Sequence, residues 1–262
     1  CDEWNAMEKL AKEKEVVGIY ISGHPLDDFR FEMKYFCNSK LEQLKNLEQH
    51  VNKNLTFGGI ITNVQHRVSQ NGKGWGSFTL EGYDESHDFR IYGEEYLKFR
   101  HFLIQNNFTF IKILVKEGWA NKGTGKKGDA RIQFQLIQYL QDVLPQFAKK
   151  LTIQMDIKAL KEDLIADLSA VFKKFQGNQT VTFEVMEFEK LKTEIALKPI
   201  EIIQEDDLDM ENLEEIDVEI QEPKVEIKVV NQLQMPSRKL KIQISNELLS
   251  ELEKKQVDFR LN

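Results

Sequence analysis

Hydrophobic residues between positions 55 and 144 gather in five short runs separated by polar breaks. Inside these runs, β-branched and aromatic residues alternate with polar ones, which is the period of half-buried strands. The predicted strands are 55–68, 74–83, 86–93, 108–120 and 131–144. Between the third and fourth run, Tyr96, Phe99 and Leu103 recur at helical spacing, so residues 94–105 are predicted to form a helix.

This order of three strands, a helix and two strands, with glycine-rich turns, is typical of the OB fold. That fold is a five-stranded Greek-key β-barrel. We therefore expect residues 55–145 to form an OB-fold domain with the helix as a plug. Ligands of this fold bind on strands 2 and 3 and between the loops that join strands 1 to 2 and 4 to 5. Here those loops are 69–74 and 121–130, and both are rich in glycine and lysine.

Cationic and aromatic residues accompany the two loops and the strands beside them. Lysine and arginine attract phosphates, and exposed rings stack on unpaired bases, so this combination predicts binding of single-stranded DNA. The predicted contact residues are Arg67, Lys73, Trp75, Arg90, Lys122, Lys126, Lys127 and Arg131. Trp75 could equally face outward or pack inside the barrel, whereas Tyr92 and Trp119 are expected to be packed. The loop lysines could also belong to an ordinary solvated hairpin tip.

Residues 1–54 are predicted to form a short helical linker before the barrel. Apolar residues recur at helical spacing over 3–15 and again over 27–36, and a polar connector follows. Between the two helices, Gly23 and Pro25 enforce a turn. His24 lies in this turn with no second histidine or cysteine near it in sequence, so we expect it to have a structural role.

Residues 146–262 are predicted to form a small α+β domain. The expected strands are 151–155, 180–187, 192–197, 239–244 and 257–261, and the expected helices are 156–175 and 246–255. The run at 192–197 is expected to pair with 180–187 as a hairpin. The closing helix carries more apolar surface than one short helix can hide. Leu248, Leu249 and Leu252 are therefore predicted to contact a protein partner, with complete burial in a core as the alternative.

An acidic run inside this last segment sets the sign of the net charge. Residues 201–222 contain eleven acidic residues and no lysine or arginine, whereas the whole chain carries a net charge of −7. The remainder is therefore net positive, and the overall charge does not exclude nucleic acid as a ligand. We expect the run to be a flexible, solvated insert; imitation of nucleic acid and docking of a basic partner are the alternatives.

The sequence offers no catalytic, metal-binding or cofactor-binding pattern. Its two cysteines are too few for a disulfide framework, and no cysteine and histidine spacing suggests zinc. The acidic run lacks a core that would hold two metal ions rigidly. With no apolar stretch of membrane-spanning length and no disulfides, a cytoplasmic protein is expected. The absence of an initiator methionine before Cys1 suggests a piece of a longer protein.

Residues 13–29, EKEVVGIYISGHPLDDF, resemble the junction before the OB domain in the alpha subunit of bacterial DNA polymerase III. That family has a glutamate-rich helix end followed by a G-[FY]-Y-[LI]-S-G-H-P-L turn, matched here at Gly18, Tyr20 and 22–26. Residues 73–100 resemble its second and third strands and the helix after them. Residues 245–249 resemble the closing helix of its tail, but the acidic insert departs from the usual compact form.

The resemblance implies the C-terminal portion of a bacterial replicative polymerase, working within the polymerase III holoenzyme. The barrel would bind the single-stranded template, and the tail would bind the tau subunit of the clamp loader. The catalytic aspartates of that family lie in an upstream palm domain, so this chain should lack polymerase activity of its own. Two other interpretations stay open, namely an RNA-binding OB module of the tRNA synthetase kind and a pure protein-interaction module. The first of these has no place for the GHPL turn.

Overall fold

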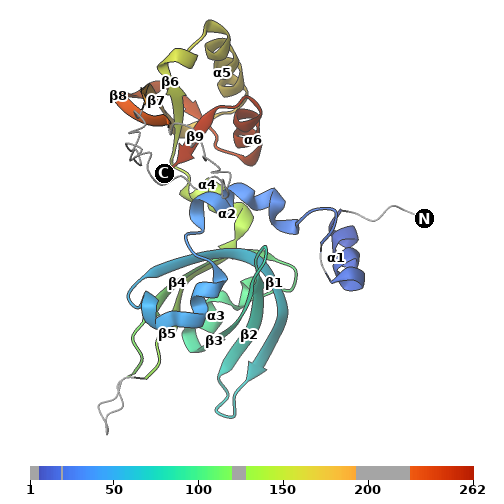
Figure 1. Ribbon diagram of the computed structural model, residues 1–262. Helices are drawn as coiled ribbons and strands as arrows, with labels where there is room; N and C mark the ends of the chain where they lie inside the picture. Colours follow the sequence, from blue (N-terminus) through green and yellow to red (C-terminus); the bar gives the residue numbers. More distant parts are fainter. Residues whose placement is uncertain (1–5, 19, 120–127, 193–224) are drawn as a thin grey trace, which may run out of the picture.

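The computed structural model of the protein describes residues 6–18, 20–119, 128–192 and 225–262. It contains two β-sheets with short helices between them (Figure 1), which confirms the expected mixture of sheet and helix. The strands are β1 Asn54–Val68, β2 Gly74–Glu81, β3 Ser86–Tyr92, β4 Phe108–Lys116, β5 Arg131–Tyr139, β6 Lys150–Asp156, β7 Gln176–Lys192, β8 Val225–Ile242 and β9 Asp258–Leu261. The α-helices are α1 Ala6–Val17, α2 Arg30–Phe36, α3 Gly93–Phe99, α4 Val143–Phe147, α5 Glu162–Lys174 and α6 Asn246–Lys254. Five 3-10 helices complete the described part: η1 Pro25–Phe29, η2 Leu41–His50, η3 Arg100–Phe102, η4 Leu140–Asp142 and η5 Ile157–Ala159.

The first sheet has five antiparallel strands in the order β3-β2-β1-β4-β5. Strand β1 is shared along its length. Its first half, from Asn54 to Ile60, pairs with β4, and its second half, up to Val68, pairs with β2. Gly59 lies where the two pairings meet, and a β-carbon there would come within 2.5 Å of the Glu81 carbonyl oxygen. The close approach of the two backbones therefore requires glycine at this position.

This sheet does not close into the barrel that the sequence predicts. In the part of the chain that the structure describes, no ladder joins β3 to β5, so both are edge strands. The rings of Phe89 on β3 and Phe134 on β5 meet across the opening with centroids 5.7 Å apart. The backbone N–H of Phe134 donates to the Glu95 carboxylate of α3 over 3.3 Å. A helix side chain thus satisfies one backbone donor at this open edge.

The core of this sheet fills its concave side with aliphatic and aromatic side chains. Buried members come from every strand and from α3. The connector before β1 also contributes, because Leu41 and Leu44 of η2 are buried against it. The sequence predicted only a polar connector there. A three-residue spacing brings side chains to the same side of a 3-10 helix, so two leucines suffice to anchor it.

The second sheet has four strands in the order β8-β7-β6-β9. Strands β6 and β7 run parallel and are joined through α5, while β8 and β9 pair antiparallel to their neighbours. The predicted hairpin between 180–187 and 192–197 is wrong. Lys192 is the last residue of β7 itself, residues 193–197 lie outside the described part, and the antiparallel partner of β7 is β8. The predicted strand at 239–244 is accordingly the end of the much longer β8.

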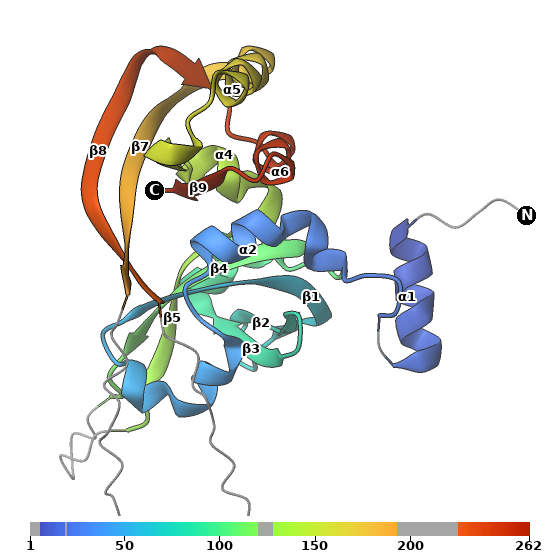
Figure 2. The ribbon, with the colours of Figure 1, turned by 45° about the horizontal axis from the view of Figure 1, so that its top comes forward.

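The helices α2 and α4 lie between the two sheets (Figure 2). Phe31 of α2 belongs to the core of the four-stranded sheet, whereas Met33 and Phe36 pack with Ile60 and Phe110 of the five-stranded one. One short helix therefore contributes to both cores.

The GHPL turn is held by contacts of its own. Nδ1 of His24 accepts a hydrogen bond from the Leu26 N–H over 3.1 Å, and its ring lies between those of Tyr20 and Tyr83, with centroids 4.9 and 4.6 Å away. Burial lowers the pKa of His24. Glu13 of α1 accepts bonds from the backbone of the returning loop at Ser22. These contacts fit the structural role expected of this histidine.

Candidate nucleic-acid interface

The alternation of β2 decides which side chains face outward. Phe78 and Leu80 are buried in the core, so Trp75, Ser77 and Thr79 lie on the opposite, outward face. The structure therefore resolves the open question about Trp75 in favour of the outward position, where its ring is half-buried.

A row of three side chains crosses this face. Arg67 on β1 stands opposite Trp75 on β2, which in turn stands opposite Tyr92 on β3. The two rings are stacked with centroids 5.6 Å apart and planes inclined by 23°. The Arg67 guanidinium lies 5.6 Å from the centroid of the Trp75 ring. Tyr92 is 55% exposed, so the expectation that it is packed was wrong. Its position after the inward-facing Phe89 and Ile91 carries the signal that could have found it.

Two polar rows continue the same face. The first joins Gln65, Ser77 and Arg90 across the three strands. Gln65 accepts a hydrogen bond from the Arg67 guanidinium over 2.5 Å, which orients that group. Arg90 is exposed. Neither Gln65 nor Ser77 was among the residues predicted from sequence, because nothing in an isolated glutamine or serine marks a contact residue.

The third row contains Thr79 and Asp88, and the Thr79 hydroxyl donates to the Asp88 carboxylate over 2.6 Å. On β1 Thr62 stands opposite Thr79, and a bulge follows before Gln65, where Asn63 has a φ of 51°. Together the rows line a shallow groove of about 320 Å³ on the surface of the sheet. The Asp88 carboxylate is the one acidic group in that lining, and its bond to Thr79 occupies one of its oxygens.

Two further predicted residues lie at the hairpins that leave the face. Lys73 is exposed at the end of the β1–β2 turn, in which Gly72 has a φ of 71°. Arg131 opens β5, and its guanidinium lies 4.2 Å from the centroid of the Trp119 ring. Trp119 is 76% exposed, so the prediction that it is packed was also wrong. It follows the end of β4 at Lys116 and therefore lies beyond the sheet that would have covered it.

The structure thus brings Arg67, Trp75 and Arg90 together on one face and leaves Lys73 and Arg131 at hairpin ends. The β1–β2 turn lies at the end of the five-stranded sheet that faces away from the four-stranded sheet (Figure 1). Lys122, Lys126 and Lys127 lie outside the described residues, as does the acidic run 201–222.

The three leucines predicted to meet a protein partner are core residues. Leu248, Leu249 and Leu252 are each 0% exposed and pack with Leu168 and Phe172 of α5. The predicted exposed patch is therefore not formed on this helix. The sequence argument considered the short helix by itself, whereas α5 and Phe31 of α2 contribute to the same core.

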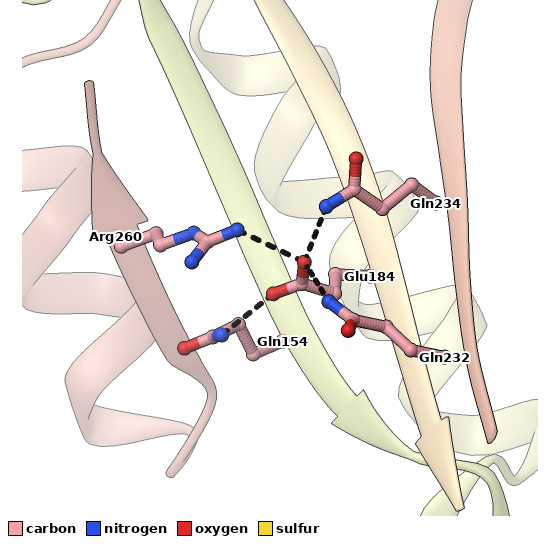
Figure 3. A network of polar contacts seen from close by, with 5 residues as sticks. All are labelled: Gln154, Glu184, Gln232, Gln234 and Arg260. Atoms are coloured by element: carbon pink, nitrogen blue, oxygen red, sulfur yellow. Dashed lines mark hydrogen bonds and ion pairs between the residues drawn. The ribbon is translucent and has the colours of Figure 1, made fainter.

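A second polar cluster lies on the four-stranded sheet (Figure 3). The buried carboxylate of Glu184 on β7 accepts hydrogen bonds of 2.6 Å from Gln154, Gln232 and Gln234, and its ion pair with Arg260 spans 2.9 Å. The bond from Gln154 is the largest cause that lowers the pKa of Glu184, with the other two glutamines and Arg260 adding to it. Its donors come from β6, β8 and β9, so this carboxylate connects the other three strands of the sheet to β7.

Neither a metal site nor a membrane span emerges from the described segments. Their histidine, cysteine, aspartate and glutamate side chains form no group of three that could hold a metal ion. None of the helices resolved here combines the length and the apolar character needed to cross a bilayer.

Comparison with known proteins places these observations in a family context. Residues 151–221 match the family described as the DNA polymerase III alpha subunit, C-terminal domain. The DNA polymerase III alpha subunit of Pseudomonas aeruginosa is 22% identical over 182 residues, which is 70% of this chain and 15% of that protein. That of Campylobacter jejuni is 27% identical over 180 residues, 68% of this chain and 14% of that protein. That of Mycobacterium tuberculosis is 34% identical over 80 residues, 30% of this chain and 7% of that protein.

The matched segments span at most about a seventh of these relatives' own length. Two of them nevertheless cover more than two thirds of the present chain. By sequence, the chain is similar to the C-terminal region of bacterial DNA polymerase III alpha subunits, as residues 13–29 indicated.

Proposed function

We propose that the outward face of β1, β2 and β3 binds single-stranded DNA. The observation that carries this proposal is the outward-facing row of Arg67, Trp75 and Tyr92, in which a cation and two rings lie side by side. Base stacking on aromatic side chains contributes about 1–3 kcal/mol per base and tolerates any sequence. Bases in a duplex are already stacked on each other, so the row selects a single strand.

The polar rows complement the aromatic one. Arg90 and Lys73 are exposed beside it and supply positive charge for a phosphate backbone. Gln65 and Ser77 supply neutral hydrogen-bonding groups between them. The strand order, with β1 shared between β2 and β4, supports reading residues 55–145 as an OB fold whose barrel is left open between β3 and β5.

Similarity to polymerase III alpha subunits supports a wider proposal. The chain would be the C-terminal part of a replicative DNA polymerase, with residues 1–54 as a linker and 146–262 as a tail domain. Its sheet would hold the single-stranded template during replication. Nucleotide transfer would take place elsewhere in the polymerase, and this part alone would be inactive. The tail would dock the tau subunit of the clamp loader through a surface other than the buried leucines of α6.

Fluorescence anisotropy with labelled oligonucleotides tests the binding proposal. Single-stranded DNA should bind more tightly than a duplex of the same sequence, and its affinity should fall as salt rises. Replacing Arg90 by alanine should make the slope of log K against log salt shallower by about 0.7, the value of one phosphate contact on a single strand. Lys173→Ala, an exposed cation on α5, is the matched control and should leave the slope unchanged.

Two results would reject the proposal. One is equal affinity for duplex and single strand, since paired bases in a duplex are not free to stack on the aromatic row. The other is an unchanged salt slope in the Arg90 variant. A clear preference for RNA over DNA of the same sequence would instead favour the RNA-binding interpretation.

A further inference from the structure

The helix α2 joins the two sheets through contacts with both. Phe31 is buried in the core of the four-stranded sheet. From the same helix, the Tyr35 hydroxyl donates to the Phe259 carbonyl of β9 over 3.2 Å. On its other side, Met33 and Phe36 pack with the five-stranded sheet. The position of the tail relative to the proposed DNA-binding face therefore depends on how α2 is held.

Polar contacts between the α2 region and α6 reinforce this junction. Arg30 forms an ion pair with Glu253 over 2.6 Å. The Asn246 side-chain amide at the start of α6 donates to the Asp28 carbonyl over 3.3 Å and to Oε1 of Glu32 over 3.1 Å. Of these contacts, the one made by Glu32 is the most deeply buried.

Glu32 is a buried carboxyl group, and one of its two oxygens has no hydrogen-bond partner among the described residues. The residue is only 1% exposed. Its Oε2 atom is shielded from solvent and has no hydrogen-bond partner within the described residues, and the same holds for Oδ1 of Asn246. A buried charge that lacks donors is much more costly than the neutral acid. Burial accordingly raises the pKa of Glu32.

The Asn246 amide offsets a negative charge on Glu32 only in part, because it donates to Oε1 and burial outweighs it. The Arg30 guanidinium on its own helix is engaged by Glu253. Cys37 at the end of α2 has a thiol pKa raised to about 12, chiefly by burial and then by Glu32 itself. A cleft of about 560 Å³ adjoins Glu32 between α4 and the start of α6. The other ionisable residue lining it is Glu247, which is also acidic; no lysine, arginine or histidine is among the residues that line this cleft.

We propose that Glu32 is a proton-dependent latch between α2 and α6. In its neutral form Glu32 stays buried on Asn246 and fixes the tail against the five-stranded sheet. Once ionised, the carboxylate lowers its free energy by moving into the adjoining cleft, where water can hydrate the charge. That movement breaks the bond to Asn246 and loosens the tail. This device acts on the junction alone and does not depend on what either sheet binds.

Distance measurements on the full chain test this latch. Spin labels are attached to cysteines introduced at Gln70 in the β1–β2 turn and Lys173 on α5, both exposed, with Cys1 changed to serine. The Cys37 thiol, with its pKa near 12, stays unlabelled. Pulsed electron resonance should give one narrow distance at the acid end of a pH titration and an added, longer population at its alkaline end. Glu32→Gln keeps the shape and cannot ionise, so its distance should stay narrow at both ends.

Glu247→Gln is the matched control, because it removes a carboxylate from the same cleft. In this variant the distance distribution should broaden as the pH rises, as it does in the unmodified chain. The latch is ruled out if the unmodified chain shows the same distance distribution at both ends of the pH range. It is ruled out too if the distribution of Glu32→Gln broadens as much as that of the unmodified chain. It is also ruled out if Glu247→Gln abolishes the change. Salt-dependent binding of single-stranded DNA is measured separately, so a failed latch leaves the binding proposal standing.

Discussion

The guanidinium of Arg67 lies 5.6 Å from the centroid of the Trp75 ring, on the outward face of the five-stranded sheet. Strand register brings the two together, since Arg67 stands directly opposite Trp75 in the β1–β2 ladder. Tyr92 extends the row from the other side of Trp75. A cation and two rings in one row are the elements on which the proposed binding of single-stranded DNA depends.

Removing the rings should weaken DNA binding without loosening the fold. Trp75→Ala and Tyr92→Ala should each raise the Kd for single-stranded DNA by roughly 10-fold, the equivalent of one stacked base at about 1–3 kcal/mol. Both side chains lie outside the core, so the thermal transition should shift little. Leu97→Ala, an exposed apolar residue on α3, serves as the control. Unchanged affinity in both ring variants would show that bases do not stack here.

Substitution of the buried leucines of α6 should lower the stability of the tail, because these side chains are core residues and not contacts to a protein partner. Leu249→Ala should lower the free energy of unfolding by about 2–5 kcal/mol, because it leaves a cavity where Leu249 packs with α5. Leu249→Glu should prevent the tail from folding altogether. Thermal denaturation followed by circular dichroism measures both. A folded Leu249→Glu variant with an unaltered transition would mean that this position is exposed after all.

The Glu184 cluster should make the tail sensitive to acid. The pKa of Glu184 is lowered in the folded state, so its contribution to stability is present above the unfolded value near 4.5 and is lost as pH falls through the folded value. Glu184→Gln should therefore unfold more easily than the unmodified chain at pH 7, by about 1–3 kcal/mol. The two should converge as the pH falls below about 4.5 and through the lowered pKa of Glu184. Urea titrations across this range provide the measurement, and a gap that widens in acid would contradict the argument.

Local patterns predicted most of the five-stranded sheet. Alternation separates Phe78 and Leu80 from Trp75 on the two faces of β2, and the structure shows that Phe78 and Leu80 face inward. The same rule, applied from Phe89 and Ile91, would have placed Tyr92 outside. What alternation cannot reveal is closure. The Glu95 carboxylate that occupies the edge of β5 comes from a helix, and no strand pattern predicts such a contact.

Long-range pairing was the part that sequence could not supply. The partner of β7 is β8, which follows after a segment of more than thirty residues. Closing a long loop costs more entropy than closing a short one, so the sequence favoured the nearer run at 192–197. The burial of Leu249 depends on α5, which is remote in sequence. Glu32 and Asn246 are likewise 214 positions apart, and no local pattern around either residue predicts their contact.

Photo-crosslinking is the most direct test of the DNA-binding face. The full chain is bound to a single-stranded oligonucleotide that carries 5-iododeoxyuridine, irradiated and digested, and the modified peptides are identified by mass spectrometry. Stacking on the row predicts adducts at Trp75 and Tyr92, reduced when Arg67 is changed to alanine. Adducts confined to other parts of the chain, with neither ring modified, would contradict the central claim.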